Sequence, residues 1–558
     1  MIRLVSAAGL GALTVLAGAL PMDAAAQNAG DFLAGRHADM QKDSEAAALF
    51  YQRALAQDPN DPYLLRRAFV LLAADGKFDK AVPLALQLQG DDPDNITALV
   101  VLAVDHFARG KVSLAEEFLD QLPPKGLSEL MGPPLRAWLA LARSNPDAAL
   151  ESLQAFDSLQ GSDEIKLMHQ ALVNDLAGRV DEARAAYDSL RQIRDRVSYR
   201  SALLMGNFYE RSGDLETARS LYELASEQSG DAALFSESLE RVAAGGAPPP
   251  AMIGTPQEGL AETLLELSTL FRRQRASDVA QIFVQLALHL RPDFSEGLLL
   301  LGEIHQDEGR AEEAIATYGR IPDADPLAWG AKLRAAEELA DLKRIEEALA
   351  TLDELAMLRS ERYEPLFRKG NLLRFEERFV EAAEAYGSAL SRAEPLERRH
   401  WPILYFRGIA YEQSDQWDKA ESDFLAALEL EPEQPLVMNY LAYSWVEQKQ
   451  NLDRAQEMLR RAVQLRPSDG YIVDSLGWVY YRLGKYEQAV EELERAVELR
   501  PQDPTINDHL GDAYWRVGRE REARFQWLRA LGLEPGEEEA PVIERKLEEG
   551  LTDQPKDI

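Results

Sequence analysis

Two stretches near the end of the chain, residues 476–501, LGWVYYRLGKYEQAVEELERAVELRP, and residues 510–535, LGDAYWRVGREREARFQWLRALGLEP, repeat one pattern at an offset of 34 residues. Each begins with Leu-Gly, has a second glycine near its middle followed by an alanine, and closes with proline. A repeat of this length indicates stacked pairs of antiparallel helices. The pattern therefore predicts an all-α solenoid.

The alanine of this pattern recurs along nearly the whole chain, with small slips in spacing. It is found at Ala47, Ala81, Ala115, Ala149, Ala183, Ala218, Ala280, Ala314, Ala348, Ala382, Ala420, Ala455, Ala489 and Ala523. We number each repeat so that this alanine falls at place 20. Residues 28–537 then hold fourteen repeats, each a helix, a turn and a second helix.

Four other columns support this register. Place 8 is a small apolar residue except at Phe69 and Ser268, as expected where the two helices of a hairpin cross closely. Place 24 is large, and we expect it to fill the space between neighbouring hairpins. Place 15 is often glycine, which suits a left-handed residue after the first helix; these glycines are Gly76, Gly110, Gly178, Gly213, Gly309, Gly484 and Gly518. Prolines near place 32 end the second helix, as at Pro467, Pro501 and Pro535.

These columns resemble the tetratricopeptide repeat (TPR) family, most fully in the last two units. The resemblance implies a right-handed superhelix, an α-solenoid of about fourteen TPR repeats. It also implies that places 2, 5, 9 and 12 of each first helix share one face and line a concave groove.

The repeat spacing is interrupted once, between Ala218 and Ala280. There the sequence predicts a helix over about residues 232–243, followed by a Gly/Pro-rich stretch. We expect a signal peptide over residues 1–26, an N-terminal lobe of about six repeats over 28–232, an insertion helix and linker over 233–260, and a C-terminal lobe of eight repeats over 261–537. Residues 538–558 are expected to form an acidic capping tail, with a helix over 541–551. The alternative for the break is a surface loop on one continuous superhelix.

Composition limits the classes of partner. The net charge of −34 disfavours nucleic acid, whose binding depends on cationic contacts, and the chain has no cysteine, which excludes disulfides and lipidation at cysteine. The N-terminal run after Arg3 is typical of a cleaved secretory signal, with a retained membrane anchor as the alternative. We therefore expect a periplasmic protein that is exported but not lipidated, with no transmembrane segment after cleavage.

Sequence motifs for catalysis are missing. The seven histidines show no metal-ligand spacing, and there is no phosphate-binding loop or nucleophile elbow. We expect no enzyme activity, no catalytic residue, no metal site and no cofactor. Function is then expected to lie in surface recognition.

The expected groove face of the last four repeats is rich in aromatic and charged residues. Such anchors suit the binding of a protein or an extended peptide with basic and apolar residues. The alternative is that the rings cover the last helices of the same chain. The candidate residues are Tyr405, Asn439, Tyr443, Tyr471, Asp474, Trp478, Tyr481, Arg482, Asp508, Asp512, Trp515 and Arg516.

The run from Asn439 through DSLGWVYYRLG to DHLGDAYWRVGREREARFQW resembles bacterial envelope repeat proteins, including adaptors of carboxyl-terminal processing proteases. The resemblance implies a non-catalytic scaffold whose partners include such a protease and cell-wall enzymes as its substrates. The alternative is a structural component of an envelope machine that exports polysaccharide or assembles outer-membrane proteins.

Overall fold

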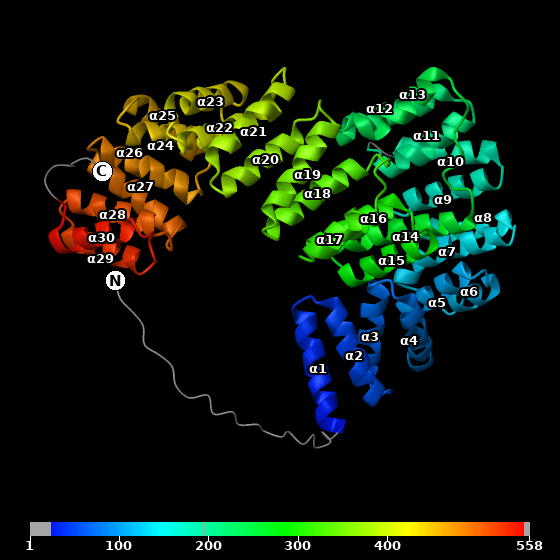
Figure 1. Ribbon diagram of the computed structural model, residues 1–558. Helices are drawn as coiled ribbons and strands as arrows, with labels where there is room; N and C mark the ends of the chain where they lie inside the picture. Colours follow the sequence, from blue (N-terminus) through cyan, green and yellow to red (C-terminus); the bar gives the residue numbers. More distant parts are fainter. Residues whose placement is uncertain (1–23, 194–195, 552–558) are drawn as a thin grey trace, which may run out of the picture. The chain divides into compact units, whose positions relative to one another are not determined.

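The computed structural model describes residues 24–193 and 196–551, and this part of the chain consists of helices and connecting turns, without a strand. Two compact units, Met1–Arg344 and Ile345–Ile558, make up the chain. Consecutive helices pair as antiparallel hairpins in each unit (Figure 1). The predicted all-α hairpin array is therefore confirmed.

The described part of unit 1, residues 24–193 and 196–344, contains eighteen α-helices and two short 3-10 helices. They are α1 (Ala24–Met40), α2 (Ser44–Gln57), α3 (Pro62–Ala74), α4 (Phe78–Asp91), α5 (Ile96–Ala108), α6 (Val112–Leu119), α7 (Leu127–Ala142), α8 (Pro146–Leu153), η1 (Gln154–Ser158), α9 (Asp163–Leu176), α10 (Val180–Ile193), α11 (Tyr199–Arg211), α12 (Leu215–Ser229), η2 (Ala232–Phe235), α13 (Ser236–Ala244), α14 (Pro256–Arg273), α15 (Ser277–Leu290), α16 (Ser295–Asp307), α17 (Ala311–Tyr318) and α18 (Ala328–Asp341).

Unit 2 continues the array and ends in a single helix that follows the last hairpin. Its helices are α19 (Ile345–Leu358), α20 (Glu364–Phe375), α21 (Phe379–Arg392), η3 (Arg398–His400), α22 (Trp401–Glu412), α23 (Trp417–Leu430), α24 (Pro435–Glu447), α25 (Leu452–Leu465), α26 (Gly470–Arg482), α27 (Tyr486–Leu499), α28 (Pro504–Arg516), α29 (Glu520–Leu531) and α30 (Glu539–Glu549).

The turn after each first helix needs a left-handed residue. All seven place-15 glycines have positive φ, between 68° and 82°. Where glycine is missing, other residues take the same conformation, for example Glu377 and Asp415 with φ of 58° and 60°. The turn is thus set by the backbone, and glycine only relieves its steric cost.

Replacing Glu377 with glycine is therefore expected to stabilise unit 2. The change removes the Cβ strain of a left-handed residue, and after the entropic penalty of glycine the net gain is about 0.5 to 1 kcal/mol. Gly484→Ala is the reciprocal variant, because its φ is 73° and a Cβ there meets open space; it should lose a similar amount. Urea unfolding measures both, and equal stability of Glu377→Gly and the parent would contradict this account.

The small residue at place 8 is required by the large residue at place 24 of the same hairpin. A Cβ on Gly302 would overlap the Tyr318 ring, and one on Gly511 would overlap the Trp527 ring. Both rings are buried. Place 24 was expected to fill the space between hairpins, but its ring lies against the glycine inside its own hairpin, where a bare backbone leaves room for it.

Ser268, one of the two exceptions at place 8, also lies where the two helices of its hairpin cross. Its hydroxyl donates to the carbonyl of Ala280 at place 20, at 2.7 Å. Places 8 and 20 therefore face each other, as the sequence predicts.

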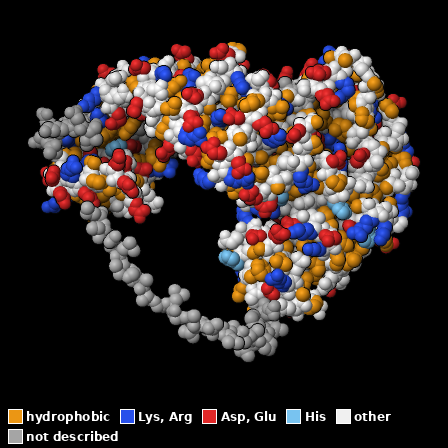
Figure 2. All heavy atoms as spheres, in the orientation of Figure 1, with side chains coloured by type: hydrophobic (Ala, Val, Ile, Leu, Met, Phe, Trp, Pro, Cys, Tyr) orange, Lys and Arg blue, Asp and Glu red, His pale blue; other side chains and the backbone are white. Residues whose placement is uncertain are grey.

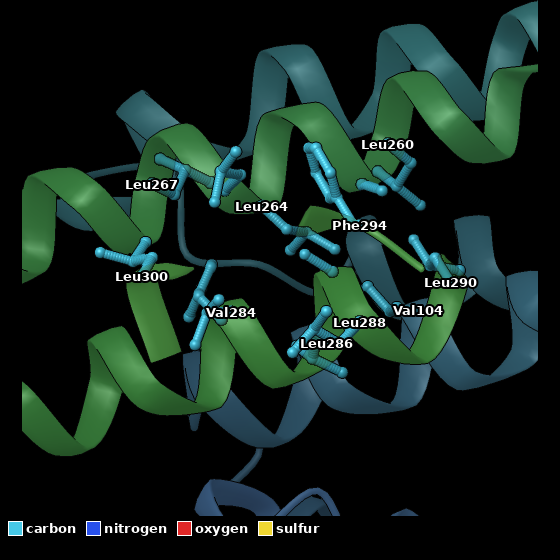
Figure 3. Close-up of a cluster of buried hydrophobic side chains, with 14 of the residues drawn as sticks. Val104, Leu260, Leu264, Leu267, Val284, Leu286, Leu288, Leu290, Phe294 and Leu300 are labelled. Carbon is cyan, nitrogen blue, oxygen red and sulfur yellow. The ribbon is translucent and has the colours of Figure 1, made fainter. Parts of the chain in front are cut away.

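In unit 1 the hairpin of α14 and α15 packs across the first helices of earlier repeats. Helix α14 contacts α7, and α15 contacts α3 and α5. Figure 3 shows the resulting apolar cluster, in which Val104 of α5 lies among leucines of α15 such as Leu288. Ion pairs join the same elements, for example Arg67 with Asp278 at 2.8 Å.

This packing corrects the predicted lobes. The insertion is helical as expected, over η2 and α13, and a Gly/Pro-rich segment follows it. However, the repeats on its two sides bury apolar surface against each other, so they belong to one compact unit, and the division falls after Arg344 instead. The boundary expected at residues 233–260 separates no lobes, because the chain folds back on itself there.

The chain ends differ in how far the structure covers them. The expected signal peptide falls mostly on residues 1–23, which lie outside the described residues. Among the helices that are described, none combines the length and the apolar character needed to span a bilayer. The expected terminal helix is present as α30, with Ile543 buried.

Candidate functional site

The twelve candidate residues lie on four first helices of unit 2, with Tyr405 on α22, Asn439 and Tyr443 on α24, and the rest on α26 and α28. These helices follow one another at intervals of one repeat, and α26 contacts both α24 and α28. The side chains at places 5, 9 and 12 therefore meet those of the next repeat. Their contacts define three overlapping groups, and Tyr471 lies outside all three.

The first group is a stack centred on Trp478. Its indole lies parallel to the Tyr481 ring, at 4.8 Å and 7°, and to the His509 imidazole, at 4.0 Å and 15°. Its Nε1 donates to Glu447 at 2.7 Å, and Arg482 pairs with the same carboxylate at 3.2 Å. The stack thus holds three successive first helices together, and Trp478 remains partly exposed.

Asp474 belongs to the same cluster but is not available to a partner. It is 7% exposed and lies 3.0 Å from His509 Nδ1. Burial opposes a charged imidazole at this position, but the Asp474 carboxylate raises the pKa of His509 above its usual value. Tyr481 is also buried, and its hydroxyl accepts from Arg516 Nε at 3.3 Å. These contacts stabilise the array rather than form an open site.

The second group is covered by α30. Lys546 donates to Asp508 at 2.7 Å and to Asp512 at 2.9 Å, and its side chain is 10% exposed. Asp512 also accepts from Trp527 Nε1 at 2.9 Å; burial raises the pKa of Asp512, while Lys546 opposes the rise.

The same helix end covers Trp515. A Cβ on Gly550 would overlap the Trp515 ring, and Arg524 lies over that ring at 5.3 Å. At Asp508, Asp512 and Trp515 the groove face is therefore covered by the last helix of the same chain. This is the alternative that the sequence left open.

The third group retains an open face. Tyr405, Asn439, Tyr443 and Arg482, together with Trp478, are only partly buried. Burial raises the pKa of Tyr443 above its usual value, and the carboxylates of Glu447 and Asp474 add to the rise. We call the set Tyr405, Asn439, Tyr443, Trp478 and Arg482 the open groove segment.

Tyr471 lies apart from this segment. It is 52% exposed, and Arg500 lies over its ring at 5.0 Å. Both residues line a small cavity of about 270 Å³ at the end of α27. The structure therefore does not bring Tyr471 together with Trp478.

Glu447, His509 and Lys546 were missed as parts of this surface. His509 comes 35 residues after Asp474, which is about one repeat, and it is adjacent to Asp508. A comparison of polar residues one repeat apart could therefore have paired His509 with Asp474. Lys546 lies outside the repeats, and no periodicity predicts its position. Within residues 24–193 and 196–551, no three His, Asp or Glu side chains gather in a geometry that could hold a metal ion.

The fold and this face define a class of protein, the helical-hairpin repeat solenoid. More specifically, residues 477–518 match a family model described as TPR repeat, and residues 367–435 and 405–470 match one described as tetratricopeptide repeat. Tetratricopeptide repeats are thus confirmed in this chain. Arrays of such repeats are scaffolds suited to protein binding.

Two relatives share part of this sequence. A TPR repeat-containing protein of Pseudomonas aeruginosa is 27% identical over 191 residues, which are 34% of this chain and 31% of that protein. The BBSome complex member BBS4 of Bos taurus is 29% identical over 109 residues, 19% of this chain and 20% of BBS4. The similarity thus spans about a third and a fifth of these relatives.

Solved structures were also matched over nearly the whole length. Cut9 in the APC/C hetero-tetramer Cut9–Hcn1 covers 94% of this chain and 96% of its own, at 16% identity and a TM-score of 0.38. Yeast Tom70 covers 95% and 96%, at 15% identity and a TM-score of 0.30.

Proposed function

We propose that this chain is a non-catalytic scaffold that binds a protein partner, or an extended peptide segment of one, on the open groove segment of unit 2. The observation that supports this most directly is the row of partly exposed aromatic side chains, Tyr405, Tyr443 and Trp478, on three successive first helices. Aromatic anchors supply a large contact area at a low entropic cost. A partner that covers them would gain most of its binding energy there.

The structure changes the chemistry expected of the ligand. Asp474 and Asp508 suggested a basic peptide, but both are paired inside the chain. Glu447 is 37% exposed but is likewise paired, with Trp478 and Arg482. We therefore propose that the ligand is mainly apolar and aromatic.

The cellular role is proposed on the sequence. The N-terminal run typical of a secretory signal supports export to the periplasm, and the resemblance of the last hundred residues supports an adaptor that brings cell-wall enzymes to a carboxyl-terminal processing protease. The rival role, a structural part of an envelope export or outer-membrane assembly machine, predicts different partners.

Mild crosslinking and co-purification test the binding face and the role together. We expect Tyr405→Ala/Tyr443→Ala to reduce partner recovery about tenfold or more, because truncation of two aromatic anchors removes about 2 kcal/mol or more of binding energy. Phe525→Ala is the matched control, since Phe525 is an aromatic residue on α29 that is 61% exposed. It should recover the partner normally.

The identity of the partner separates the two roles. A soluble protease recovered together with hydrolases supports the adaptor, and an integral outer-membrane complex supports the structural role. Equal recovery by the double variant and Phe525→Ala, with both folded by circular dichroism, would reject the open groove segment as the binding face.

A further inference from the structure

Unit 1 contains a cavity of about 670 Å³ beside the Gly/Pro-rich segment that follows α13. Its walls come from α11, α13, the start of α14 and the loops before α16 and α18. Residues Pro249–Met252 form one side, with Tyr199 and Tyr222 among the other lining residues. The cavity lies in the other unit from the open groove segment.

The Gly/Pro-rich wall is fixed by hydrogen bonds. Asn207 of α11 donates from Nδ2 to the carbonyl of Pro250 at 2.9 Å, and its Oδ1 accepts from Met252 N at 3.3 Å. Arg211 Nε donates to the same oxygen at 2.9 Å and orients the amide. A segment that cannot be helical is thus held against the helices, so the cavity is a built feature of the fold.

The lining is acidic, because its five carboxylates outnumber its three arginines. Arg200 pairs with Glu262 at 2.7 Å and with Glu296 at 2.9 Å, and Arg241 pairs with buried Glu210 at 2.8 Å. The third lining arginine, Arg291, lies 3.8 Å from Asp293, so all three arginines are paired with carboxylates. The lining carboxylates are Glu237, Glu258, Asp293, Glu296 and Asp325.

The pKa of a lining tyrosine also reflects the negative charge of the cavity. The pKa of Tyr199 is raised, first by burial and then by the carboxylates of Glu296 and Asp325. Glu237 and Asp293, with side chains 86% and 83% exposed, lie at the rim, 3.9 Å from Arg241 and 3.8 Å from Arg291. A cation that enters the cavity would meet carboxylates, while its aliphatic stem could pack against proline and tyrosine.

We propose that this cavity is a second binding site, which accepts an extended protein segment bearing a lysine or arginine side chain. The charge at the rim selects the basic residue, and the volume admits a few residues of peptide. The site is separate from the open groove segment, so the scaffold would hold a partner, or two partners, at two places.

Fluorescence anisotropy tests this with the full chain and a labelled heptapeptide that alternates lysine and glycine. We expect Glu237→Lys/Asp293→Lys to weaken binding about tenfold or more. Ala251→Trp should have a similar effect, because Ala251 lines the cavity and the larger ring fills it without changing charge. The matched control is Asp147→Lys, an 83% exposed aspartate in the same unit whose partner is Arg179.

The Asp147→Lys control distinguishes binding at this cavity from nonspecific attraction of a basic peptide to an acidic protein. Weakening by both cavity variants, with Asp147→Lys equal to the parent, would support the site. Three results would overturn it: equal affinity of the parent and the cavity variants, equal binding of a glutamate-glycine heptapeptide, or no binding by the parent at millimolar peptide. Thermal unfolding of each variant establishes that it is folded.

Discussion

Replacing Lys546 with methionine is expected to lower the free energy of unfolding of unit 2 by about 3 to 5 kcal/mol, because it removes the cation that pairs directly with two buried carboxylates. Asp508 and Asp512 lie within 2.9 Å of the Lys546 amino group, and both carboxylates are largely buried. Methionine fills much the same volume but leaves both carboxylates without their ammonium partner. Urea unfolding followed by tryptophan emission measures the loss, since Trp515 and Trp527 adjoin the cluster.

Two further variants identify the cause. Arg545→Met removes a charge from the exposed side of the same helix and should change little. Lys546→Met/Asp508→Asn/Asp512→Asn removes the charges together, and most of the lost stability should return. If Lys546→Met unfolds like Arg545→Met, α30 is not anchored by this cluster.

Replacing Gly259 with valine is expected to destabilise unit 1 by about 3 kcal/mol, since overpacking a close helix contact costs about that much. A Cβ on Gly259 would overlap the Trp138 ring, which is fully buried between α7 and α14. The side chain therefore has to push α14 away from α7. Hydrogen exchange should show lost protection over residues 256–290, with unit 2 unaffected.

Gly330→Val is the matched control, because Gly330 is a helical glycine of the same unit where a Cβ meets open space. A smaller ring opposite the new side chain should recover part of the stability, so Gly259→Val/Trp138→Leu is expected to be more stable than Gly259→Val. Equal protection in Gly259→Val and Gly330→Val would mean that α14 does not rest on Trp138.

The candidate site shows which of its features the repeat pattern can predict. Place numbers put the candidate residues on the correct first helices, because a side chain's face follows from its position along a helix. They could not say which of these side chains are already occupied. Asp474 is paired with His509 one repeat later, and Asp508 with Lys546 from outside the repeats.

The sequence of unit 1 also indicated that part of its groove is covered, although the repeat period alone does not show this. The helix of residues 96–108, ITALVVLAVDHFA, is apolar on nearly every side, and Val100 and Val104 occupy groove places 5 and 9. A helix that is apolar all round is buried all round. This indicates that something covers the groove face there, and the structure identifies it as the α14 and α15 hairpin.

The sequence by itself determined the hairpins, their turns and their small crossing residues, because these depend on contacts within about 34 residues and recur in every repeat. Tertiary structure alone decided which groove faces stay open. The repeat pattern does not predict the contacts of α14 with α7 or of Lys546 with Asp508, and burial of apolar surface and charge pairing select them only once the chain has folded.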